Sequence, residues 1–123
     1  MVTVTKQFRF EAAHHLPDYN GPCSNLHGHS YLLEVEVCKT KYTDKLCKYG
    51  GMVIDFGDLK RIVNSNVVDR LDHQYLNDIL PIIPTAENMV EWIADQLQTS
   101  ALGESIYRIR LWETVNSCAT WRK

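Results

Sequence analysis

The segment CSNLHGHSYLLEVEV, residues 23–37, joins a group of polar side chains to the clearest strand pattern in the chain. From position 31 onward, every second residue is apolar, which is typical of a strand that buries one face. The pattern predicts a strand over about residues 28–39. His27 and His29 precede and begin this strand, and they share the parity of its apolar positions. We therefore expect both imidazoles to project from the buried face.

A second alternating stretch lies upstream, at residues 2–14, where most even positions are apolar. The loop-like segment PDYNGPCSN, residues 17–25, follows it with two prolines, a glycine and two asparagines. We expect the strands on either side of this loop to be antiparallel neighbours. His14 would then lie at the same end of the sheet as the His-Gly-His segment.

Two amphipathic helices are predicted further along the chain. DFGDLKRIVNSNVVDRL, residues 55–71, combines an apolar stripe with Asp55 as a candidate N-cap. Residues 86–99 carry a second stripe, and Thr85 is placed to cap it.

The C-terminal residues 104–123 predict two further strands joined by a tight turn around Asn116 and Ser117. Residues 39–51 form a charged connector, and residues 71–84 form a polar loop rich in proline at its end. The order strand, strand, helix, helix, strand, strand predicts an α+β fold. We expect a four-stranded antiparallel sheet with both helices on one face.

Length and composition indicate one domain spanning residues 1–123. A net charge of −2 gives no electrostatic reason to expect nucleic acid, and no apolar run is long enough to span a membrane. The N-terminus lacks a signal-peptide pattern, so we expect a cytoplasmic protein with free cysteines. Such a short chain leaves little room for a deep pocket, which favours oligomerisation with sites between subunits.

Three histidines are candidate metal ligands. His14 has the parity of the buried face, whereas its neighbour His15 points to the opposite side. Three imidazoles on an otherwise apolar wall would be unfavourable to bury without a common partner. His14, His27 and His29 therefore predict a zinc site with one open position. Zinc is favoured over iron because no carboxylate shares the face of the three nitrogens.

Cys23 precedes this site by four residues and has two interpretations. It is either a reactive thiol beside the metal or the fourth ligand of a closed structural zinc site. Asp72 and His73 are adjacent in a loop, where a carboxylate can orient an imidazole, although such a pair is also common in surface turns.

Glu113 ends the apolar face of the third long strand. A carboxylate in this position often simply reaches solvent. Alternatively, its two oxygens can accept hydrogen bonds from a ligand that carries paired N–H donors.

Six segments occur together in an informative order: FEAAHHLP, CSNLHGHSY, VIDFGDLK, LDHQYLND, PTAEN and WETVNSCA. In sequence and spacing they resemble the 6-pyruvoyltetrahydropterin synthase / 6-carboxytetrahydropterin synthase family over nearly the whole chain. The resemblance implies the tunnelling fold (T-fold), with trimeric barrels that assemble into hexamers as dimers of trimers.

The resemblance also implies roles for individual residues. His14, His27 and His29 match the zinc ligands, and Cys23 matches the catalytic base. Asp72 and His73 match the acid/base dyad, Glu113 matches the carboxylate that anchors the pterin, and Thr85 and Glu87 match a region that lines the pterin pocket. His15 departs from the family pattern, which often has arginine at this position.

The spacing Cys-x-x-x-His-Gly-His is similar to that of the 6-carboxytetrahydropterin synthases of queuosine (7-deazaguanine) biosynthesis. The resemblance implies a zinc-dependent lyase that converts 7,8-dihydroneopterin triphosphate to 6-carboxy-5,6,7,8-tetrahydropterin, acetaldehyde and triphosphate. Three alternatives stay open: a 6-pyruvoyltetrahydropterin synthase of the tetrahydrobiopterin pathway, a pterin aldolase-like relative, and a non-catalytic structural zinc module.

Overall fold

A twisted sheet forms one layer of the molecule, and the computed structural model describes it over the whole chain, residues 1–123. The long strands β1 (Thr3–His14) and β2 (His27–Cys38) pair antiparallel without interruption from Thr3↔Cys38 to His14↔His27. The strands β4 (Ile106–Thr114) and β5 (Ser117–Arg122) continue the sheet beyond β2. The predicted antiparallel pairing is confirmed, with β2 beginning one residue earlier than expected.

The sheet has five strands and not the predicted four. The additional strand β3 (Gln74–Tyr75) pairs parallel to the end of β1, which gives the order β3-β1-β2-β4-β5. The predicted polar loop therefore contains this strand and the single-turn helix α4 (Leu76–Ile79). A strand of two residues is too short for its alternation to be visible in a sequence.

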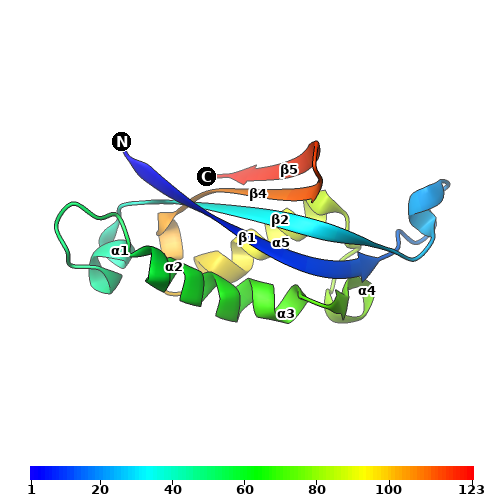
Figure 1. Cartoon of the computed structure of the whole chain (residues 1–123), viewed down its shortest axis with the longest axis horizontal. Helices are drawn as coiled ribbons and strands as arrows, with labels where there is room; N and C mark the ends of the chain where they lie inside the picture. Colours follow the sequence, from blue (N-terminus) through cyan, green and yellow to red (C-terminus); the bar gives the residue numbers. More distant parts are fainter.

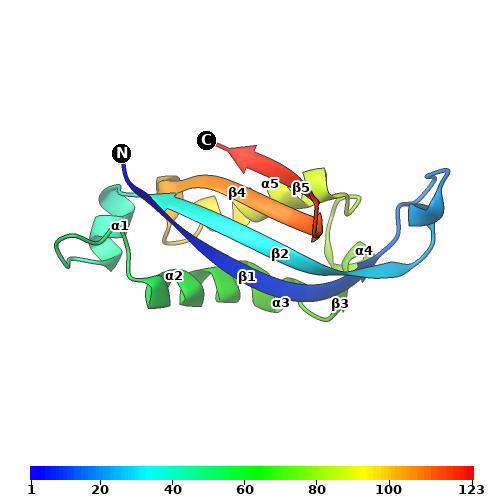
Figure 2. The ribbon, with the colours of Figure 1, turned by 45° about the horizontal axis from the view of Figure 1, so that its top comes forward.

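The helices lie on one face of the sheet, as predicted (Figures 1 and 2). Asp55 caps α2 (Phe56–Val63) by accepting hydrogen bonds from the backbone N–H groups of Gly57 and Asp58. Thr85 caps α5 (Ala86–Gln98) in the same way, through the backbone N–H group of Asn88. Both predicted N-caps are confirmed.

The first predicted helix is not uniform. After α2 the backbone widens into a π-helical turn, η2 (Asn64–Val68), and closes with the short α3 (Asp69–Leu71). The charged connector also contains an unpredicted helix, α1 (Lys41–Leu46), whose first turn is held by a capping box between Thr40 and Thr43. Short 3-10 turns lie at η1 (Pro22–Ser24) and η3 (Gly103–Ser105).

The core lies between the helices and the inner face of the sheet. Its fully buried side chains include Tyr31, Leu59, Met89, Ile93 and Leu111. At one end of this layer His14 is also buried, with 1% of its surface exposed. No helix of the protein has both the length and the apolar character needed to cross a bilayer.

Candidate metal centre

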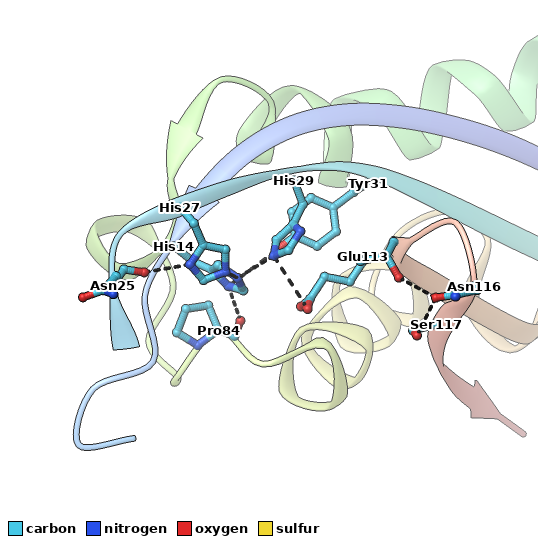
Figure 3. Close-up of polar contacts among 10 residues, drawn as sticks. His14, Asn25, His27, His29, Tyr31, Pro84, Glu113, Asn116 and Ser117 are labelled. Atoms are coloured by element: carbon cyan, nitrogen blue, oxygen red, sulfur yellow. Dashed lines mark hydrogen bonds and ion pairs between the residues drawn. The ribbon is translucent and has the colours of Figure 1, made fainter. Parts of the chain in front are cut away.

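The ladder between β1 and β2 brings the three predicted histidines together. His14 lies directly opposite His27, and His29 lies two residues further along β2 on the same face. The Nε2 atom of His14 is 3.0 Å from that of His27 and 3.1 Å from that of His29 (Figure 3). The three rings therefore converge on one point at the end of the core.

Backbone carbonyl groups fix the orientation of two of these rings. The Nδ1–H group of His14 donates to the carbonyl oxygen of Pro84 at 2.7 Å, and that of His27 donates to the carbonyl oxygen of Asn25 at 2.7 Å (Figure 3). In a neutral imidazole, the proton on Nδ1 leaves Nε2 as an acceptor only. Two lone pairs therefore face each other across 3.0 Å. A metal ion between the two nitrogens, or a proton on one of them, would remove the repulsion between these lone pairs.

The distances fit a metal ion with imidazole ligands. Zn–N bonds of about 2.0–2.1 Å at tetrahedral angles place ligand nitrogens about 3.3 Å apart. Histidine ligands of zinc usually donate their second ring N–H to a carbonyl or carboxylate, as His14 and His27 do here. The three histidines have donor atoms that all lie within 4.8 Å of one another, and Cys23 is not part of this group.

Burial favours the neutral imidazoles that bind metals. Desolvation lowers the pKa of His14, although its bond to Pro84 opposes this effect. Desolvation also lowers the pKa of His29, and the charge of Glu113 opposes it. Because a metal competes with protons for the same lone pairs, lowered pKa values support metal binding at neutral pH.

Glu113 points toward the cluster and contradicts one argument made from the sequence. Its Oε1 atom lies 3.6 Å from Nε2 of His29, so a carboxylate does share the face of the three nitrogens. The ladder between β4 and β5 shifts register between Trp112 and Thr114, so Glu113 lies at a β-bulge. Leu111, two residues earlier in β4, pairs with Leu33 of the buried face, so strand parity also assigns Glu113 to this face. The choice of zinc over iron then depends on the three imidazoles.

Cys23 lies in η1, at the mouth of a hollow of about 490 Å³. The loop that carries it is closed by the N–H group of Leu16, which donates to the carbonyl oxygen of Cys23 at 2.8 Å. Thr85, Glu87 and Glu113 line the same hollow. Four of the residues predicted for the site thus surround one cavity beside the histidine cluster.

Asp72 and His73 lie elsewhere on the chain. They are 3.0 Å apart, and His73 lines a second hollow of about 530 Å³ together with Glu11, His29 and Ser30. The side chains of Glu11 and Ser30 have the parity opposite to that of the three histidines, so they lie on the other face of the sheet. The structure does not bring the dyad to the metal centre of the same chain.

Hydrogen bonds to Glu11 nevertheless anchor the dyad to β1. The backbone N–H group of Glu11 donates to the Asp72 carboxylate at 2.9 Å, and this bond is the main reason that the pKa of Asp72 is lowered. His73 has a φ of 60° and donates its own N–H group to the carbonyl oxygen of Glu11. A non-glycine residue in the left-handed region is uncommon and often occurs at functional sites.

Some residues of the site were not found from the sequence. Tyr31 is fully buried next to the cluster, with its ring centroid 5.5 Å from that of His29, and burial raises the pKa of its hydroxyl group. The backbone carbonyl groups of Pro84 and Asn25 were not predicted as part of the site, because every residue type has a backbone carbonyl group. Their positions follow only from the folded backbone.

Known proteins share this sequence and fold. The model of the family described as 6-pyruvoyl tetrahydropterin synthase matches residues 3–123. The chain belongs to this family.

Two relatives with similar sequences carry the same name, 6-carboxy-5,6,7,8-tetrahydropterin synthase. The protein from Haemophilus influenzae is 34% identical over 144 residues and covers both chains completely. The protein from Synechocystis is 38% identical over 125 residues, which is 98% of this chain and 93% of the relative. Among solved structures, the 6-pyruvoyl tetrahydropterin synthase of Caenorhabditis elegans superimposes with a TM-score of 0.83 at 25% identity, covering 99% of this chain and 95% of the other. Membership in the family and its T-fold are thereby confirmed.

Proposed function

We propose that this protein is a zinc-dependent 6-carboxy-5,6,7,8-tetrahydropterin synthase of 7-deazaguanine biosynthesis. The substrate would be 7,8-dihydroneopterin triphosphate. With uptake of one water molecule, it would yield 6-carboxytetrahydropterin, acetaldehyde and triphosphate. The observation that carries the proposal is the convergence of three Nε2 atoms at about 3 Å, next to a hollow lined by Cys23 and Glu113. The names of the two bacterial relatives support the choice of product.

His14, His27 and His29 would hold the zinc ion. When bound, the ion would supply Lewis-acid chemistry toward the hydroxyl groups of the substrate side chain. The Glu113 carboxylate would accept two hydrogen bonds from the N–H groups of the pterin ring, which fixes the ring in the hollow. Because Glu113 lies 3.6 Å from His29, a ring bound to it would lie within reach of the proposed metal ion.

Cys23 would remove a proton from the side chain of the substrate. Its half-buried thiol lines the hollow and is free of any disulfide. His73, oriented by Asp72, would exchange protons with the same side chain. Because His73 lines the second hollow and not this one, the dyad would serve the hollow of a neighbouring subunit in the oligomer that we expect.

A product assay tests the reaction. Purified protein is incubated with 7,8-dihydroneopterin triphosphate, and acetaldehyde and the pterin product are measured together with bound zinc. We expect acetaldehyde and 6-carboxytetrahydropterin in equal amounts. A 6-pyruvoyl product without acetaldehyde would contradict the proposal and favour the pyruvoyl-forming alternative.

The variant Cys23→Ala separates an enzyme from a structural zinc module. We expect it to retain zinc and to lose activity by about 10²–10⁴-fold, the usual effect of removing a general base. Cys47→Ala is the matched control, because Cys47 is another free thiol that lies in the distant connector. Loss of zinc and of folded structure in Cys23→Ala would instead indicate a closed site with four ligands.

A further inference from the structure

The end of β1, which carries His14, is held along its outer edge by the segment 72–77. The parallel strand β3 pairs with Ala12 and Ala13, and this pairing ends at Tyr75. Beyond that point the side chain of Asn77, in place of a strand backbone, forms hydrogen bonds with β1's continuation at His15. Its Oδ1 accepts from the backbone N–H group of His15 at 2.9 Å, and its Nδ2 donates to the carbonyl oxygen of His15 at 3.0 Å.

These two bonds let one carboxamide act as a further residue of the parallel strand. A backbone amide offers one donor and one acceptor, and the side chain of Asn77 offers the same pair in similar geometry. It therefore extends the ladder of β1 by one position, to the residue directly after the metal ligand. The peptide groups on both sides of His15, the first of which links it to His14, are thereby restrained.

The ring of His15 is restrained as well. It stacks on Tyr75, with ring centroids 5.9 Å apart and an angle of 18° between the planes, and the Tyr75 hydroxyl group bonds to its Nδ1 atom. Two histidines in succession offer two imidazoles at the end of one strand. These contacts keep the second imidazole away from the cluster that the first one enters.

We propose that Asn77 is a positioning residue of the metal centre. By fixing the main chain at His15, it holds the Nε2 atom of His14 in register with those of His27 and His29. Functional groups usually have to be held within about 0.5 Å of their working geometry. This inference depends on the metal site of the proposed function, but not on the identity of the product.

Metal binding by three variants tests the inference. Asn77→Ala removes both bonds, and Asn77→Asp keeps the acceptor but replaces the donor with an oxygen that repels the His15 carbonyl group. Asn66→Ala is the matched control, because the half-buried Asn66 also donates from its side-chain amide to a backbone carbonyl, that of Ile62, in the distant η2 turn. Zinc affinity is measured by chelator competition, and ligand geometry by the visible spectrum of the Co²⁺-substituted protein.

We expect both Asn77 variants to bind zinc about tenfold to 100-fold more weakly, as is common when a group that orients a ligand is removed. Their Co²⁺ spectra should differ from that of the wild type, whereas Asn66→Ala should match it. A purely structural role would lower thermal stability without changing zinc affinity or the spectrum, and that result would overturn the inference. If Asn77→Ala does not fold, the zinc affinity and the Co²⁺ spectrum of Asn77→Asp test the inference alone.

The two proposals fail in different ways. Wild-type protein that binds zinc and releases acetaldehyde, together with Asn77 variants of unchanged affinity and spectrum, would reject only the positioning role. Wild-type protein that binds no zinc at the three histidines would reject both.

Discussion

At the scale of single residues, the proposed metal centre depends on which nitrogen of each imidazole carries the proton. Pro84 and Asn25 select the Nδ1–H tautomer through their carbonyl groups and leave Nε2 free on His14 and His27. Neither residue type would attract attention in a search for functional side chains. Backbone carbonyl groups, and not additional polar side chains, thus set the orientation and the tautomer of two of the candidate ligands.

Glu113→Gln is expected to separate substrate binding from metal binding. The amide keeps the shape of the side chain but loses the charge and one acceptor. A hydrogen bond to a charged group contributes about 1.5–3 kcal/mol, so kcat/KM should fall by roughly 10–100-fold, mainly through KM. Bound zinc, measured by metal analysis, should stay at the wild-type level.

Loss of zinc from Glu113→Gln would contradict this assignment. It would show that the carboxylate, 3.6 Å from His29, supports the metal and not the substrate. Thr114→Ala is a suitable control, because the neighbouring side chain is exposed and does not line the hollow.

Strand parity was sufficient to predict the three histidines. His14 and His27 face each other because the alternation of both strands persists to their last residues. Parity also assigned Glu113 to the apolar face, where the structure has it, although the argument for zinc over iron overlooked this carboxylate. Parity was insufficient for Asp72 and His73, since a loop has no periodicity. The resemblance to a family assigned roles to these residues. It did not show whether they belong to the same site as the three histidines of their own chain.

At the scale of secondary structure, the caps were predictable and the short elements were not. Asp55 and Thr85 each precede an amphipathic stripe that marks a helix start. The π-helical turn η2 inserts one extra residue into an otherwise regular pattern, which periodicity does not detect. Likewise, β3 forms only because the edge of β1 is available to it.

Asp55→Ala is expected to destabilise the protein without affecting the site. The substitution removes the acceptor for two backbone N–H groups at the start of α2. Loss of an N-cap typically lowers the free energy of unfolding by about 1 kcal/mol, within a range of about 0.5–2 kcal/mol. Chemical denaturation of the two proteins measures this difference.

The conservative variant Asp55→Asn provides the control, because asparagine is an equally good N-cap. It should be nearly as stable as the wild type. A loss of zinc in Asp55→Ala would mean that the start of α2 affects metal binding, contrary to this expectation.

At the scale of the whole molecule, the predicted catalytic groups are divided between two hollows. Cys23 and Glu113 line one hollow, while His73 lines the other, on the far side of β1 from the ladder between β1 and β2. One chain alone therefore offers an incomplete set of groups. An oligomer that places His73 of one subunit beside Cys23 of another would complete each site.

Mixing two inactive variants tests this division. Cys23→Ala and His73→Ala are each expected to be inactive, but subunits exchanged between them should form some sites with both groups intact. If each site combines groups from two subunits at random, about a quarter of the sites in an equal mixture would be complete. Activity is measured after partial unfolding and reassembly of the mixture.

A mixture that stays inactive would contradict shared sites. Each variant reassembled alone serves as the control, and retention of zinc in both shows that the metal centre is intact. Restored activity in the mixture, but not in either control, would support an oligomeric enzyme.

The uninterrupted ladder between β1 and β2 has a consequence for how such proteins can diversify. Inserting one residue within either strand would turn a histidine to the opposite face and destroy the ligand set. Residues 17–26 lie outside the ladder, so Cys23 can move closer or further through changes in loop length while the ligands stay in place. Evolution can therefore alter the reach of the thiol while the three histidines keep their arrangement.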